Sequence, residues 1–151
     1  MPTLRPVPIL AVLALLTCQP VRADEPVPMR RLTPAEIQAL LPGAAPGAGI
    51  GMTVLSGDPA KPGLYTVRVA FPAHARVRPH THRDNRSVVV LSGTWHLGYG
   101  GTFNAADLKA LPTGSFYTEP AGQAHFGEAG DEPVVIWVTG SGPSDTTFVS
   151  P

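Results

Sequence analysis

Turn-forming residues interrupt this chain so often that long helices are excluded from most of it. The sequence contains 18 prolines and 16 glycines, and a proline inside a helix or a central strand removes a backbone hydrogen-bond donor. Short runs rich in β-branched and aromatic residues remain between the turns, at 50–55, 64–71, 87–91, 94–97, 115–118, 134–138 and, more weakly, 146–149. Short strands with turn signals between them indicate an all-β sandwich or barrel.

Two segments are nevertheless predicted to be helical. The first follows Thr33, which forms a capping box with Glu36, and it ends at Pro42-Gly43. A second, short helix is expected from Asn104 to Pro112. Neither helix carries a group of residues with an evident chemical role.

The first 23 residues have the order of a secretory signal peptide. Arg5 precedes an apolar stretch at 9–16, and small residues lead to a cleavage site near Ala23. The apolar stretch is too short to span a membrane. We therefore expect a periplasmic or secreted protein with an N-terminal arm at 24–60, which includes the short helix, and a barrel at 61–151. A lipoprotein anchor at Cys18 is disfavoured, because threonine precedes it instead of a small residue.

The charge balance and the single cysteine exclude several classes of function. The chain has 11 acidic and 11 basic residues, and removal of Arg5 and Arg22 with the signal peptide leaves a slight acidic excess. This argues against nucleic acid or an anionic membrane as partner, so a small molecule is expected. Cys18 would leave with the signal peptide, so the mature chain would have no disulfide and no thiolate ligand.

His80 and His82 are the first candidate metal ligands. In an extended chain, residues two apart project to the same side, so the two imidazoles would converge and a third could complete a site. By itself this spacing is a weak signal, and exposed loop histidines remain the alternative.

A second pattern lies downstream, where Gly114, Pro120, Gly122 and His125 follow the spacing G-x5-P-x-G-x2-H. Together with His80, His82 and Gly93 upstream, this pattern resembles the two motifs of the cupin superfamily. The first of these motifs is G-x5-H-x-H-x3-4-E-x6-G, and the downstream pattern corresponds to the second. The chain is similar to small secreted bacterial cupins. The resemblance implies a double-stranded β-helix, or jelly-roll barrel, in which His80, His82 and His125 bind one divalent metal ion, which would be Fe, Zn, Mn, Ni or Cu. It also implies pairing into a homodimer through sheet edges.

Two positions depart from the first motif. His74 replaces its opening glycine, which is a mild change because histidine tolerates positive φ better than most residues. Arg86 replaces its glutamate, so the resemblance gives three imidazoles and no carboxylate. Arg86 either faces the pocket, where its guanidinium would grip a small anionic substrate, or points outward and pairs with Asp84 at the surface. A degenerate site that has lost its metal is a third alternative.

Other residues are weaker candidates for a fourth ligand. Glu119 and Glu128 are expected to be solvated at turns or strand ends. His96 alternates with Trp95 and Leu97, so it faces outward if these apolar residues line the barrel.

Three functions stay open. Three-histidine cupins include thiol and diketone dioxygenases, so the resemblance implies a metal-dependent, dioxygenase-like enzyme on a small anionic substrate. The alternatives are a non-catalytic module that binds a metal or small ligand, and a metal-free barrel with a structural role.

Overall fold

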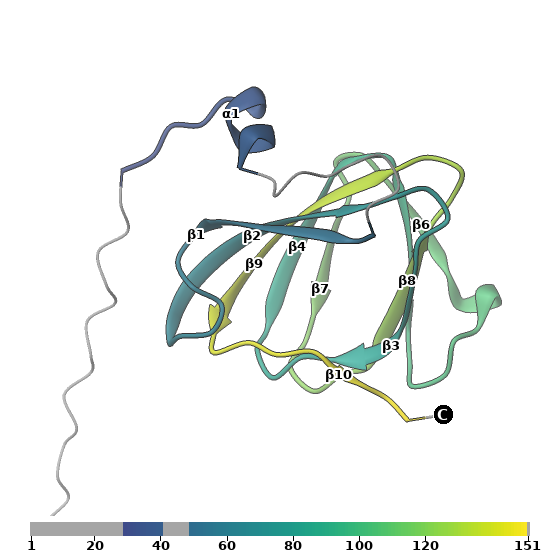
Figure 1. The fold of residues 1–151 in the computed structure, drawn as a ribbon. Helices are drawn as coiled ribbons and strands as arrows, with labels where there is room; N and C mark the ends of the chain where they lie inside the picture. The colour runs from purple at the N-terminus through teal and green to yellow at the C-terminus, as the bar shows by residue number, and fades with distance from the viewer. Residues whose placement is uncertain (1–28, 41–48, 151) are drawn as a thin grey trace, which may run out of the picture.

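The computed structural model describes residues 29–40 and 49–150. The second of these segments forms two antiparallel sheets that face each other (Figure 1). One five-stranded sheet has the order β1 (Gly51–Ser56), β2 (Gly63–Phe71), β9 (Val134–Gly142), β4 (Arg86–Ser92) and β7 (Phe116–Glu119). The other has the order β10 (Thr147–Phe148), β3 (Arg76–Thr81), β8 (His125–Ala129), β5 (Thr94–Tyr99) and β6 (Lys109–Pro112). The predicted all-β jelly-roll barrel with a short N-terminal helix is confirmed.

The N-terminal helix α1 (Pro34–Ala39) lies beside the barrel near β1 (Figure 1). Its capping box is formed as predicted: the Thr33 backbone N–H donates to Glu36 Oε2 at 2.7 Å, and the Glu36 N–H donates to Thr33 Oγ1 at 3.3 Å. The predicted signal peptide, Cys18 and the Pro42-Gly43 helix stop lie outside the described residues. In the described segments, no helix has the length and apolar character needed to cross a membrane.

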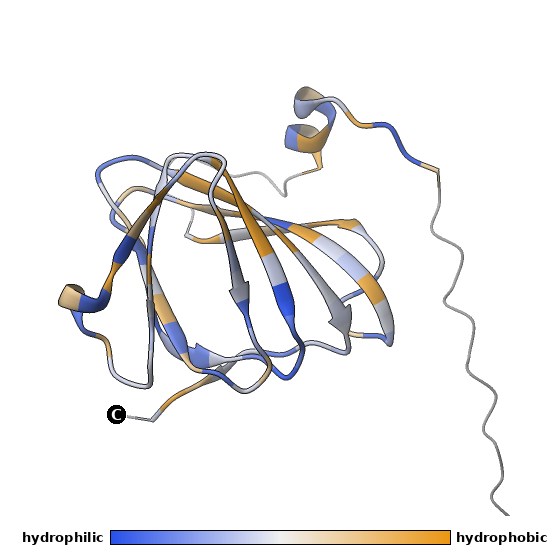
Figure 2. Cartoon of the chain, turned by 180° about the vertical axis from the view of Figure 1, so that it is seen from behind, coloured by the Kyte–Doolittle hydropathy of each residue, from blue (hydrophilic) through white to orange (hydrophobic). Residues whose placement is uncertain are grey.

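The core lies between the two sheets because apolar side chains alternate along the strands. In β4, Val88 and Val90 are buried whereas Val89 and Leu91 are exposed, as the two-residue strand period requires. Figure 2 shows the resulting change of hydropathy along the strands. Across the core, Phe71 and Trp95 stack with ring centroids 4.4 Å apart.

The structure corrects the prediction for 104–112. The segment forms a 3-10 turn, η1 (Ala105–Asp107), followed by strand β6. The Asn104 side chain accepts from the Ala106 N–H at 3.1 Å, so Asn104 caps this turn. The backbone then leaves the helical region because β6 pairs with β5, with Leu111 opposite Trp95 in the core. Tertiary pairing here overrides local helix preference.

Strands β3 and β8 were not predicted, although they carry the site. β3 has the sequence RVRPHT, and β8 has HFGEA. Neither contains the run of β-branched residues that identifies a strand from sequence. Both lie in the middle of their sheet, and they pair with each other.

The turn before β3 has the backbone conformation that the first motif requires. His74, which occupies the place of the motif's opening glycine, has φ = 62°. Its N–H donates to the Gly130 carbonyl at 2.8 Å, which ties this turn to the end of β8. Histidine therefore replaces glycine here in the left-handed region, as expected from its tolerance of positive φ.

Candidate metal centre

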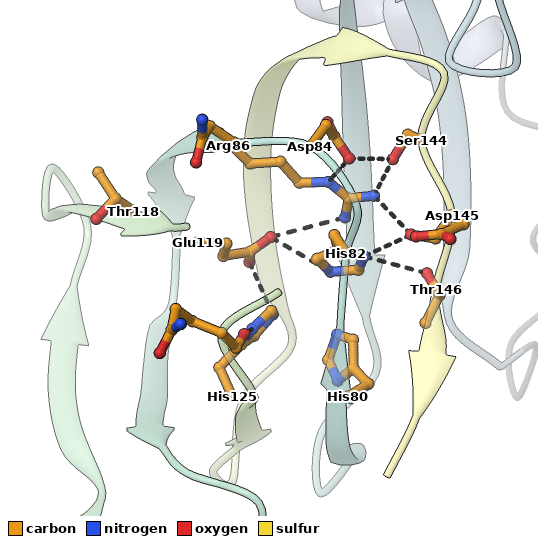
Figure 3. A network of polar contacts seen from close by, with 12 residues as sticks. His80, His82, Asp84, Arg86, Thr118, Glu119, His125, Ser144, Asp145 and Thr146 are labelled. Atoms are coloured by element: carbon orange, nitrogen blue, oxygen red, sulfur yellow. Dashed lines mark hydrogen bonds and ion pairs between the residues drawn. The ribbon is translucent and has the colours of Figure 1, made fainter. Parts of the chain in front are cut away.

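The structure brings the three predicted histidines together inside the barrel. His80 lies in β3 directly opposite His125 of β8, and His82 follows the end of β3. The side chains of His80 and His82 project to the same side, as their spacing predicted (Figure 3). All three residues are buried, and one possible ligand atom from each lies within 4.8 Å of the others.

Hydrogen bonds to backbone carbonyls orient all three rings. The Nδ1–H groups of His80, His82 and His125 donate to the carbonyls of Arg78, Asp145 and Gln123, at 2.8, 2.6 and 3.2 Å respectively. A carbonyl oxygen only accepts, so Nδ1 carries the proton in each neutral ring and Nε2 keeps its lone pair. This is the outer hydrogen bond that metal-binding histidines ordinarily make.

Burial keeps these rings neutral. Removal from water lowers the pKa of His82 to about 4, and the positive charge of Arg86 adds to this effect. The pKa values of His80 and His125 are also lowered, mainly by burial. Three neutral imidazoles at pH 7 are the form that binds divalent transition metals.

The Arg86 side chain points toward the three histidines, which is one of the two predicted alternatives (Figure 3). Its Nη1 lies 3.6 Å from Glu119 Oε2, and its Nε lies 3.4 Å from Asp84 Oδ1. Its Nη2 donates to Ser144 Oγ and to the Asp145 carbonyl, the latter at 3.1 Å. The predicted Asp84 partner is therefore real, but the pair is buried beside the histidines instead of lying at the surface.

Asp84 anchors this network and was missed as a site residue. Its carboxylate accepts from the Tyr65 and Ser144 hydroxyls, each at 2.6 Å. Burial alone would raise the pKa of Asp84, but these two hydrogen bonds and Arg86 outweigh burial and lower it. One signal was available, because Asp84 lies two residues after His82. The contributions of Tyr65 and Ser144 depend on β2 and on the segment after β9, which no local pattern connects to the motif.

Glu119 lies at a strand end, as predicted, but it is buried instead of solvated. It ends β7 and is only 6% exposed. Its Oε2 lies 3.5 Å from His82 Nε2, and its Oε1 lies 3.6 Å from His125 Nε2 (Figure 3). Burial raises the pKa of Glu119, and Arg86 opposes this rise. The cause of the difference is pairing between β4 and β7, which sets Glu119 directly opposite Arg86.

The remaining candidates lie apart from this cluster. His96 is opposite Glu128 of β8, and its neighbours Trp95 and Leu97 are the ones that enter the core. His96 therefore faces outward, as the alternation predicted. Glu128 pairs with Arg76 at 2.8 Å on the outside of the barrel.

One hollow of about 660 Å³ borders the turn that leads into β8. It is lined by Tyr99, Gly100, Gly101, Thr118, Pro120, Gln123 and Ala124. None of the three histidines lines it. Tyr99 is exposed, and its hydroxyl donates to the Thr118 carbonyl at 2.6 Å, so the side chain connects β5 to β7 on the outside of the barrel.

A known family matches the sequence that forms this barrel. The profile of the ChrR cupin-like domain matches residues 37–145, which is most of the chain and includes His80, His82, Arg86, Glu119 and His125. The chain belongs to the ChrR cupin-like family. Membership of the cupin superfamily, as the two motifs predicted, is thereby confirmed. No curated protein sequence matches the chain.

Solved cupin-type structures share the fold at low sequence identity. The polyketide cyclase RemF from Streptomyces resistomycificus is 16% identical, with 82% of this chain and 87% of that one covered and a TM-score of 0.64. A double-stranded β-helix protein from Klebsiella pneumoniae is 14% identical, with coverage of 82% and 100% and a TM-score of 0.62. An RmlC-like cupin from Shewanella frigidimarina is 22% identical, with coverage of 63% and 78% and a TM-score of 0.52. At these identities the likeness shows the fold alone.

Proposed function

We propose that this cupin binds one divalent metal ion through His80, His82 and His125. The observation that carries the proposal is the common orientation of the three rings. Each donates its Nδ1–H to a backbone carbonyl, which leaves three Nε2 lone pairs for an ion inside the barrel. Imidazoles that share one ion with bonds of about 2.0–2.1 Å lie closer together than 4.8 Å, so binding draws these rings inward.

The test is metal binding by residues 24–151. The protein is stripped with a chelator and titrated with Zn²⁺ against a chromophoric competitor, and protein from its native host is assayed for Fe, Zn, Mn, Ni and Cu. We expect one ion per chain and loss of binding in the variant His80→Ala plus His82→Ala. His96→Ala is the matched control, since His96 faces outward, and it should bind as the wild type does. Binding that survives loss of His80 and His82 would remove the site.

For the bound ion we propose a catalytic role in dioxygenase-like chemistry on a small anionic substrate. Three imidazoles leave coordination positions open, and an open position is what a catalytic metal needs. Arg86 supports an anionic substrate, because its guanidinium points toward the histidine cluster (Figure 3) and its Nη1 approaches Glu119 only to 3.6 Å. Oxygen uptake by the iron-loaded protein with a panel of small carboxylates and thiols is the assay. Absence of turnover across the panel would favour the alternative, a module that binds a metal or small ligand without catalysis.

We further propose export to the periplasm or the medium after cleavage near Ala23. The support is the order of residues 1–23, in which a basic residue precedes a short apolar stretch and a small-residue cleavage site. Mass spectrometry of the full-length gene product from its host should give a chain that begins at Asp24. Light scattering of the same sample checks the expected homodimer.

A further inference from the structure

The centre contains more hydrogen-bond acceptors than donors. Because their Nδ1 protons are donated elsewhere, His82 and His125 present Nε2 lone pairs to Glu119, whose two oxygens lie 3.5 and 3.6 Å away. The carboxylate is itself an acceptor when ionised. Neither approach is therefore a hydrogen bond, and both His125 Nε2 and Glu119 Oε2 are buried without a hydrogen-bond partner in the described part of the chain.

Buried acceptors that face one another are unfavourable unless a proton or a metal cation lies between them, and separations of 3.5 and 3.6 Å are too long for a shared proton. Arg86 supplies one positive charge to Glu119, but its Nη1 approaches Oε2 only to 3.6 Å. Its other contacts, to Asp84, Ser144 and the Asp145 carbonyl, hold the guanidinium without Glu119. Arg86 therefore keeps its position even if Glu119 binds another cation.

The sheet register explains how a carboxylate reaches this point from β7. Arg86 and Glu119 are directly opposite in the antiparallel pair β4–β7, and opposite residues project to the same face with Cβ atoms about 4.5–5.5 Å apart. A carboxylate moved from one of these two paired positions to the other still points toward the three histidines. Arg86 occupies the position where the first motif has its glutamate, and Glu119 stands across from it.

We propose that Glu119 is a metal ligand, so that the centre comprises three imidazoles from β3 and β8 and one carboxylate from β7. This inference rests on the proposed metal site and adds a residue that the two sequence motifs do not include. The carboxylate brings one negative charge to the ion, which offsets the neighbouring Arg86. A hard oxygen donor beside three imidazoles also favours Zn, Fe or Mn over soft ions such as Cu(I).

The experiment compares Glu119→Gln with Glu128→Gln in residues 24–151. Glu128 is the matched control, since it is the same residue type in an adjacent part of the barrel but pairs with Arg76 on the outside. We expect Zn²⁺ affinity to fall at least about 100-fold in Glu119→Gln, beyond the 10–100-fold typical of an outer hydrogen-bonding partner. Co²⁺ bound to this variant should show a changed visible absorption spectrum, because one donor atom is lost. Glu128→Gln should match the wild type in both measurements.

A second variant keeps the test decisive. Arg86→Glu combined with Glu119→Gln moves the carboxylate from β7 to the paired position on β4. This double variant should restore Zn²⁺ affinity to within about tenfold of the wild type. If the wild type binds Zn²⁺ and Glu119→Gln binds it equally well with the same Co²⁺ spectrum, Glu119 is no ligand and the three-histidine site stands alone. If the wild type binds no metal at all, the proposed function fails and this inference falls with it.

Discussion

Replacement of Arg86 by methionine should destabilise the metal-free protein strongly. Arg86 lies between two buried carboxylates, with side-chain exposures of 3% for Asp84 and 7% for Glu119, and its own side chain is 15% exposed. Methionine preserves most of the apolar volume but removes the positive charge. Two carboxylates then remain buried with no cation beside them in the described structure.

The magnitude follows from the partners that each carboxylate keeps. Removal of one member of a buried ion pair costs about 3–5 kcal/mol. Asp84 retains hydrogen bonds from Tyr65 and Ser144, whereas Glu119 Oε2 has no hydrogen-bond partner among residues 29–40 and 49–150. Because only Glu119 is left without a partner, we expect the free energy of unfolding to fall by about 3 kcal/mol, near the lower end of the 3–5 kcal/mol range. This corresponds to a fall in melting temperature of about 12 °C if each kcal/mol lowers it by about 4 °C.

Chemical denaturation of the chelator-treated protein at pH 7 measures this effect. Arg76→Met is the control, because Arg76 also pairs with a glutamate across two strands, at 2.8 Å, but is 58% exposed. Its free energy of unfolding should change by less than about 1 kcal/mol. Saturating Zn²⁺ should narrow the gap between Arg86→Met and the wild type, because the ion supplies a positive charge beside Glu119. An unfolding free energy for metal-free Arg86→Met within 1 kcal/mol of the wild type would refute the argument that this arginine neutralises a buried pair.

Two further predictions concern acid stability and core packing. Burial lowers the pKa of His82 in the folded protein from its ordinary value of 6.5 to about 4, so its contribution to stability is complete above pH 6.5 and is lost as the pH falls toward 4. The difference in unfolding free energy between the metal-free wild type and His82→Asn should therefore shrink over that range, and a difference that grows as the pH falls would contradict this assignment. Gly127→Ala should lower the free energy of unfolding, measured in urea, by about 1–3 kcal/mol, because the added Cβ would lie 2.4 Å from Trp95 Cζ2. In the control Gly130→Ala the added Cβ would lie 3.6 Å from its nearest neighbour, so this free energy should change little. Equal stability of the two variants would count against a rigid contact at Trp95.

Much of the fold is predictable because strand period and turn chemistry are local. The alternation around Val88 and Val90, the capping box at Thr33, and the turn glycines all act over a few residues. The two motifs also place His80, His82 and His125 in one site, since their spacing is tied to a particular barrel. Strands β3 and β8 could not be recognised in the same way, because their polar and histidine-rich sequences become strands only through pairing within the sheet.

The sequence by itself determined an all-β barrel and three histidines on two segments that would meet, since both depend on periodicity and motif spacing. Only the tertiary structure decided the charges around them. Pairing of β4 with β7 set Glu119 across from Arg86, and the chain after β9 brought Ser144 and Asp145 onto the same guanidinium. Charge interactions inside a barrel depend on which strands are neighbours and on what water is excluded, and neither is encoded within a short stretch of residues.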